Sequence, residues 1–89
     1  MQKSLRAVHY LIIGVNVAAV IVKSDMAGTV SKIVVQVGST VAEDDALLIM
    51  ESMKMEIPVA APRAGRITAI HTAEGEVVGE GDVLISLDA

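Results

Sequence analysis

Lys54 is the residue of this sequence best placed for covalent chemistry, because it stands between Met53 and Met55 where the chain must reverse. The apolar segments on its two sides, LLIM and IPVA, are typical of buried strands. A two-residue loop between such strands needs positive φ and normally contains Asn, Asp or Gly. The stretch ESMKME has none of these residues, and this departure from local turn chemistry indicates a functional position.

The chemistry open to Lys54 is acylation of its amine. A lysine amine attacks an activated acyl group only in its neutral form, and with a reference pKa near 10.4 about one lysine in a thousand is neutral at physiological pH. Because Glu51 and Glu56 favour the charged ammonium, a second protein must supply the catalytic environment. The acylated side chain becomes a long uncharged arm. The flexible thioethers of Met53 and Met55 can repack against different partner surfaces.

The elements that must position Lys54 form an internal repeat. A shift of 37 residues aligns residues 26–51 with residues 63–88 without a gap. Both Ala-Gly pairs, both later glycines and both Glu-x-Asp turns then coincide, which chance matches between valine-rich strands would not easily produce. The register ends by pairing Glu51 with Asp88. Nothing in the second copy therefore corresponds to residues 52–57, which we name the lysine hairpin.

Each copy alternates apolar and polar residues with a period of two, as half-buried strands do. The alternation runs from Ile33 to Val37 in the first copy and over residues 83–87 in the second. Glycines punctuate this pattern where another backbone approaches closely or where the chain turns. These structural glycines are Gly28, Gly38, Gly65, Gly75 and Gly81. The sequence predicts an all-β flattened barrel or sandwich of about eight short strands in two halves related by a pseudo-two-fold axis.

The predicted two-fold relation also locates the lysine hairpin. Residues 52–62 link the two copies, and residues 15–25 lead into the first copy, so these two segments occupy equivalent positions at opposite ends. We therefore expect the lysine hairpin to project from the end that is remote from both termini.

Composition excludes several classes of function. The chain has 89 residues, enough for one domain, with an aliphatic core and Tyr10 as its single aromatic residue. A formal net charge of −4 and scattered basic residues argue against nucleic acid as a partner. The chain has no cysteine for a disulfide or a thiolate metal site, which fits a reducing compartment, and we expect the cytoplasm. The acidic turn residues lack the spacing of metal ligands.

Residues 1–16 are interpreted as an N-terminal extension and residues 17–89 as the domain itself. The apolar run from Ala7 to Val22 follows basic residues, as in a signal peptide or a membrane anchor. The run is shorter than the roughly 20 residues that span a bilayer, it lacks a clear cleavage site, and its last part is needed as a strand. We expect the extension to pack on the domain or to fray, and we expect no membrane partner.

The stretch ESMKMEIPVAAP, with AGTVSKIVVQVGSTV before it and GRITAIHTAEGEVVGEGDVLISL after it, resembles the biotinyl/lipoyl carrier domains. It is most similar to biotin carboxyl carrier proteins and to the carrier segments of biotin-dependent carboxylases, over about residues 18–88. The resemblance implies that Lys54 receives biotin through an amide bond and that Met53 and Met55 serve recognition and carboxylation. It also implies three partners: a biotin protein ligase, a biotin carboxylase subunit and a carboxyltransferase subunit. Biotin on Lys54 would then carry a carboxyl group from the active site of the biotin carboxylase to that of the carboxyltransferase, commonly for an acyl-CoA substrate.

The sequence departs from the family pattern at Ser52, because alanine usually precedes Met-Lys-Met. One added oxygen on an exposed tip leaves the assignment intact and can alter the efficiency of the ligase. Glu51 and Glu56 are interpreted as surface charges that flank the lysine hairpin and that partners can read. Some members of the family insert a thumb in the first half, for which residues 34–43 leave no room.

Three alternatives come from other classes of protein. Lipoyl carriers resemble the same fold but usually have an acidic residue before the lysine and a small one after it, so the two methionines favour biotin. A free-standing enzyme would need a nucleophile–base pair, a phosphate loop or a metal motif, and we expect a carrier without an active site of its own. The adaptor modules of membrane-fusion proteins have a long helical hairpin between their halves, whereas residues 52–62 alone join the halves here.

Overall fold

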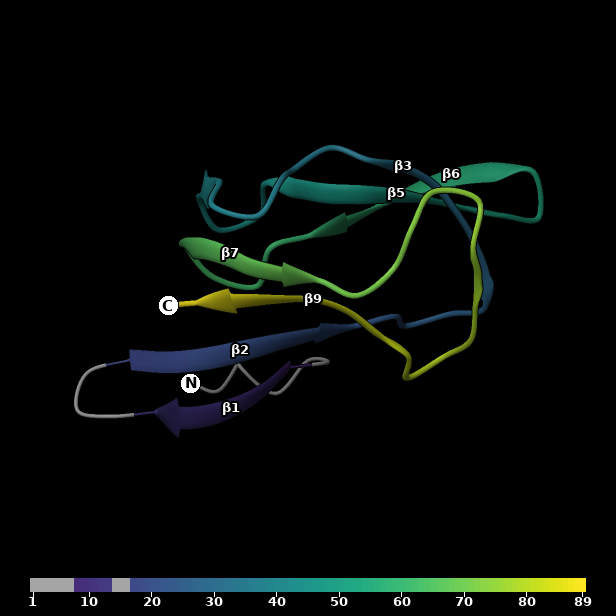
Figure 1. Ribbon diagram of the computed structural model, residues 1–89. Coiled ribbons are helices and arrows are strands. Elements are labelled where there is room, and N and C mark those ends of the chain that lie inside the picture. The colour runs from purple at the N-terminus through teal and green to yellow at the C-terminus, as the bar shows by residue number, and fades with distance from the viewer. Residues whose placement is uncertain (1–7, 14–16) are drawn as a thin grey trace.

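The structure is a computed structural model that describes residues 8–13 and 17–89 (Figure 1). These residues form nine strands joined by turns, and none of them belongs to a helix that could cross a membrane. The strands are β1 (Val8–Ile13), β2 (Val17–Lys23), β3 (Gly28–Ile33), β4 (Thr40–Val41), β5 (Ala46–Ser52), β6 (Met55–Ala60), β7 (Gly65–Ile70), β8 (Val77–Val78) and β9 (Val83–Asp88).

Eight of these strands form two four-stranded antiparallel sheets that stack face to face. One sheet has the order β2-β9-β7-β4, and the other has the order β6-β5-β3-β8. Figure 1 shows the two layers edge-on, with β5 and β6 in one layer and β9 and β2 in the other. The predicted all-β sandwich of about eight short strands is confirmed. Residues 34–39 connect β3 to β4 directly, without a thumb.

A pseudo-two-fold axis relates the two halves, and the 37-residue shift seen in the sequence also relates their contacts. The shift maps β2, β3, β4 and β5 onto β6, β7, β8 and β9. The Val30 N–H donates to the Glu76 carbonyl, and the equivalent Ile67 N–H donates to the Ser39 carbonyl, both over 2.9 Å. Because each half completes hydrogen bonds of the other, the halves interlock and depend on one another.

Gly28 and Gly65 open equivalent strands at points of close backbone contact. A Cβ atom at Gly28 would lie 2.7 Å from the Glu51 carbonyl oxygen, and one at Gly65 would collide with the carbonyl oxygen of Asp88. A separation of that size is too short for any side chain, so these positions accept only glycine. Gly28 thereby lets β3 lie against the end of β5, directly before the lysine hairpin.

Among the side chains that the structure describes, the buried core between the sheets is aliphatic apart from Met50. Its apolar side chains come from both halves in nearly equal number, as the two-fold relation requires. They are Val20, Val22, Val30, Val41, Leu47, Leu48, Met50, Ala61, Ile67, Val78, Leu84, Ile85 and Leu87. Burial of this apolar surface supplies the main free energy that holds the sandwich together.

The predicted strand alternation is wrong at two places. β3 ends at Ile33, and Val37 is 62% exposed, because the chain leaves the sheet for a turn that is closed by the Ser39 N–H and the Gln36 carbonyl. In β9, Val83 is 39% exposed while both Leu84 and Ile85 are fully buried. Lys23 pairs with Val83 and Val22 with Ile85, so Leu84 is the extra residue of a bulge that shifts the period by one.

The N-terminal extension contributes the ninth strand. β1 pairs antiparallel with β2 from Val8 opposite Val22 to Ile13 opposite Val17, and it widens one sheet to five strands. The extension was expected either to pack on the domain or to fray, and residues 8–13 pack on the domain through this pairing. The rest of the extension, residues 1–7 and 14–16, lies outside the described residues.

Candidate functional site

The lysine hairpin is a two-residue β-hairpin built by the pairing of β5 with β6. Ser52 pairs with Met55, so that Met53 and Lys54 alone form the loop. Their φ angles are 55° and 63°, both in the left-handed region. Positive φ at both central residues is typical of the type I′ turn, whose twist matches that of the strands it joins.

This loop conformation is strained because of the side chains that occupy it. An L-residue with a Cβ atom loses about 1–2 kcal/mol in the left-handed region, and Asn or Gly would reduce this loss. The continuous β5–β6 pairing on both sides holds Met53 and Lys54 in place in spite of it. Strain that the surrounding structure maintains is typical of functional positions.

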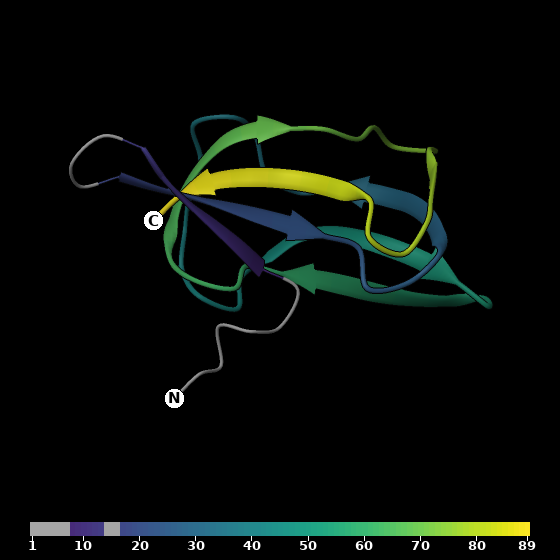
Figure 2. The same cartoon turned by 90° about the horizontal axis from the view of Figure 1, so that it is seen from below.

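Solvent surrounds the tip of the lysine hairpin. Met53 is 90% exposed and Met55 is 60% exposed, and Lys54 between them is also exposed. Figures 1 and 2 show the hairpin and the C-terminus at opposite ends of the molecule. The lysine hairpin was also expected to be remote from the N-terminus, but residues 1–7 lie outside the described residues. Large apolar side chains that project into water are typical of surfaces that meet another protein.

The flanking carboxylates lie directly opposite one another. Glu51 pairs with Glu56 across the two strands, one position behind Ser52 and Met55, and both glutamates are exposed. Like charges in such a cross-strand pair destabilise a sheet. The pair therefore gives the domain no stability of its own, and it places negative charge beside the Lys54 ammonium.

The remaining glycines of the predicted set lie in turns. Gly38, Gly75 and Gly81 have φ angles of 96°, 90° and 91°, which glycine adopts without strain. Gly38 and Gly75 are equivalent under the two-fold relation, and the position equivalent to Gly81 is Asp44. These turns position the strands and contribute no reactive group.

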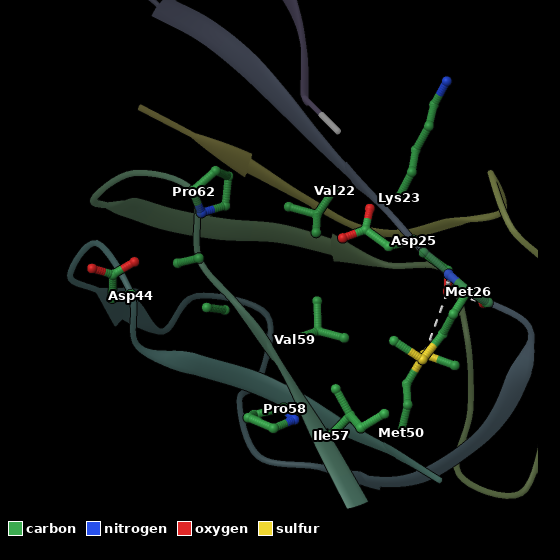
Figure 3. Close-up of a pocket in the computed structure, with 13 residues that line it drawn as sticks. Val22, Lys23, Asp25, Met26, Asp44, Met50, Ile57, Pro58, Val59 and Pro62 are labelled. Carbon is green, nitrogen blue, oxygen red and sulfur yellow. Dashed lines mark hydrogen bonds between the residues drawn. The ribbon is translucent and has the colours of Figure 1, made fainter. Parts of the chain in front are cut away.

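A pocket beside the lysine hairpin was not predicted from the sequence. It has a volume of about 270 Å³ and lies between β2 and the edge strand β6 (Figure 3). Ser24, a buried polar residue, lines it together with Met26, Met50 and Ile57. Extending the 37-residue shift to positions before residue 26 pairs Ser24 with Ala61, and this mismatch is a signal that could have pointed to the pocket.

The described part of the chain contains no group of three His, Asp or Glu side chains arranged to hold a metal ion. His71, the one histidine with a described side chain, lies 2.8 Å from Ser86, with its Nε2 facing the serine Oγ. His71 directly follows β7 and is exposed, and Ser86 lies half-buried in β9 of the same sheet.

Comparison with known proteins identifies relatives of this chain. The family model described as "Biotin-requiring enzyme", for biotin and lipoyl domains, matches residues 15–87. A biotin/lipoyl attachment protein of Bacillus subtilis is 42% identical over 66 residues, which cover 74% of this chain and 90% of that protein.

Two further relatives are longer than this chain. The biotin carboxyl carrier protein of Streptococcus mutans is 44% identical over 70 residues, which are 79% of this chain and 54% of that protein. A solved structure of a single-chain, multi-domain long-chain acyl-CoA carboxylase superposes with a TM-score of 0.74 at 32% identity, over 78% of this chain and 7% of the carboxylase. The chain thus spans about half of the streptococcal carrier and a small part of the carboxylase.

The segment matched by the family model includes the lysine hairpin and the sandwich up to Leu87, and the two carrier relatives are named for biotin carboxyl transport and for biotin or lipoyl attachment. The chain belongs to the biotin/lipoyl family, as a biotin carboxyl carrier domain that has biotin as its cofactor.

Proposed function

We propose that Lys54 is the residue that carries biotin, and that the domain moves a carboxyl group between two active sites of a carboxylase. The position of Lys54 in the strained, exposed two-residue loop carries this proposal. Lys23 and Lys32, the other lysines with described side chains, lie within β2 and β3. A lysine that belongs to a paired strand is held close to the sheet, whereas the loop of a hairpin can enter the active site of a ligase.

The residues at the tip fit an attached biotin. Among the described residues no hydrogen bond or ion pair engages the Lys54 amine, so acylation would break no contact of the fold. When bound, biotin supplies a ureido nitrogen that accepts and donates carboxyl. The chain itself presents the arm, keeps its base fixed through the β5–β6 pairing, and surrounds it with the adaptable side chains of Met53 and Met55.

The tip residues have different roles in this proposal. Met53 and Met55 contribute apolar contact to each partner in turn, because thioether side chains adopt many shapes at little cost. The Glu51–Glu56 pair favours partners with a basic surface, since charge complementarity guides association. Ser52, which pairs with Met55, closes the loop and brings a hydroxyl to a position where the resembling carriers usually have alanine.

The partners in this proposal are a biotin protein ligase, a biotin carboxylase and a carboxyltransferase. The Streptococcus mutans relative is named a biotin carboxyl carrier protein, and the superposed structure is an acyl-CoA carboxylase. The second of these relatives supports an acyl-CoA as the final acceptor. A cytoplasmic location is part of the proposal and rests on the cysteine-free composition, which fits a reducing compartment.

The test is biotinylation of the full chain during co-expression with a biotin ligase. Intact-mass measurement should show one biotinyl group, peptide mapping should place it on Lys54, and Lys54→Arg should remove it. Lys32→Arg, at an exposed lysine within a strand, is the matched control and should leave labelling unchanged. Biotin on another lysine, or on the Lys54→Arg variant, would refute the assignment. A lipoyl group on Lys54 would identify the chain as the other type of carrier.

A further inference from the structure

The pocket between β2 and β6 lies on the pseudo-two-fold axis. Residues 22–25 and their equivalents 59–62 all line it, so the two halves contribute facing walls. Figure 3 shows Val22 and Asp25 on one wall and Ile57, Pro58 and Val59 on the other. Because β5 pairs Met50 with Ile57, the end of the pocket formed by these two residues is the end nearer to the lysine hairpin.

The two ends of the pocket differ, although the fold that forms them is symmetric. At the end near the lysine hairpin, the Ser24 hydroxyl donates to the Met26 carbonyl over 2.6 Å and lies 3.4 Å from the sulfur of Met50. This end therefore combines two polarisable thioethers with a buried hydroxyl. The equivalent residues of the other half are Ala61, Arg63 and Leu87. The sequence has diverged from its own repeat where the pocket faces Lys54.

We propose that this pocket binds the bicyclic ring of the biotin carried by Lys54, so that the arm docks on its own domain between visits to partner active sites. The inference rests on the proposed attachment of biotin to Lys54. It adds a binding site within the domain for the ring of that arm.

The arm is long enough to reach the pocket. Ile57 lies three residues after Lys54 in an extended strand, or about 10 Å away at a rise of about 3.3 Å per residue. Eleven single bonds from the lysine Cα to the biotin ring span roughly 13 Å when extended, by the reach of a backbone with three bonds per residue. The ring can therefore fold back along β6 and enter the pocket beside Ile57.

The lining matches the chemistry of the ring. The thioether side of the bicycle is apolar and polarisable, and Met26, Met50 and Ile57 offer contacts of the same kind. The urea side has two N–H donors, and the carboxylate of Asp25 at the pocket wall is engaged by no other described residue. A volume of about 270 Å³ suits a fused pair of five-membered rings and would be small for a drug-sized ligand.

Docking of this kind withdraws an uncharged, largely apolar ring from water without fixing it permanently. The pocket is shallow enough to remain open to solvent on one side, with Asp25 and Pro58 exposed at its edge. Partner active sites can then compete for the ring.

The experiment compares the full chain with and without biotin on Lys54, the modification being verified by mass, using methyl-labelled Met, Ile and Leu in NMR. The inference predicts nuclear Overhauser contacts from ring protons to the methyl groups of Met26, Met50 and Ile57, together with shifts of those methyl signals. Leu87, the equivalent of Met50 in the other half, is the internal control and should not shift. Val59→Phe, which fills the pocket, should remove the contacts, and Val37→Phe, at an exposed turn outside it, should retain them.

The outcomes separate this inference from the proposed function. Biotin on Lys54 without ring contacts or shifts at Met50 and Ile57 would overturn the docking site and leave the attachment intact. Absence of biotin from Lys54 would overturn both. If Val59→Phe disturbs the fold, Asp25→Ala at an exposed position takes its place, and it should weaken the ring contacts by removing an acceptor for the urea N–H groups.

Discussion

Asp44 and Gly81 occupy the same position in the two halves, and both have positive φ, 74° and 91°. They stand at equivalent turns, in which Asp45 and Asp82 accept hydrogen bonds from the Ala42 and Gly79 N–H groups over 2.9 and 2.8 Å. The second half uses glycine where the backbone needs a left-handed conformation. The first half uses aspartate, one of the few other residues that tolerate it. The turn geometry is thus set by the fold, and each half satisfies it with a different residue.

Gly81→Ala should destabilise the domain by about 1 kcal/mol, because alanine is strained at positive φ. A Cβ at this position would meet no atom within 4 Å, so the loss would come from the backbone alone. Urea denaturation measures the change in the free energy of unfolding. Gly79→Ala is the control, since its Cβ would have only an ordinary contact 3.9 Å from Asp82, and it should be neutral or stabilising. Equal effects of both variants would contradict the role assigned to φ.

Met53→Asn should stabilise the domain by about 1 kcal/mol, because asparagine tolerates the left-handed conformation of this loop position. The same variant should be bound less well by the carboxylase partners, since an exposed thioether is lost. Met55→Asn is the matched control, because Met55 is an exposed methionine that lies in β6. It should not gain stability, and a gain equal to that of Met53→Asn would show that the loop is unstrained.

Leu84→Ala should lower the free energy of unfolding by about 2–5 kcal/mol, because Leu84 is fully buried in the bulge of β9. Ile33→Ala should lower it by only about 1–2 kcal/mol, since Ile33 is partly buried at the margin of the core. Denaturant midpoints at constant m-value provide the comparison. Equal losses from the two variants would show that Ile33 contributes as much to the core as Leu84 does, against its partial burial in the structure.

Deletion of residues 1–16 should retain both the folded state and biotinylation. β1 pairs with the outer edge of β2, and the equivalent strand β6 has no strand on its outer edge among the described residues. The sandwich of eight strands does not require such a partner. A dispersed NMR spectrum of the shortened chain, with labelling equal to that of the full chain, is the expected result. A collapsed spectrum would show that β1 is an essential part of the sheet.

Much of the fold could be predicted because its determinants are local or repeated. The period of two predicted strands, the glycines predicted turns and close approaches, and the 37-residue repeat predicted the two-fold relation. The reversal of the chain at Met53-Lys54 followed from apolar segments on both sides of a polar loop. The errors at Val37 and at Leu84 lie where a strand ends early and where a bulge shifts the period. Neither event has a signal in the alternation of residue types, since both depend on how neighbouring strands pair.

The sequence by itself determined that one lysine lies between two methionines at a strand reversal, because a two-residue hairpin is specified by residues next to one another in the chain. Only the tertiary structure decided what lies beside that lysine. Ser24 and Met50 are 26 positions apart, and they meet only because the facing sheets bring β2 and β5 together. The pocket they form depends on the simultaneous packing of both halves, which no short segment encodes. The pairing of β1 with β2 likewise follows from an edge that exists only once the sheet has formed.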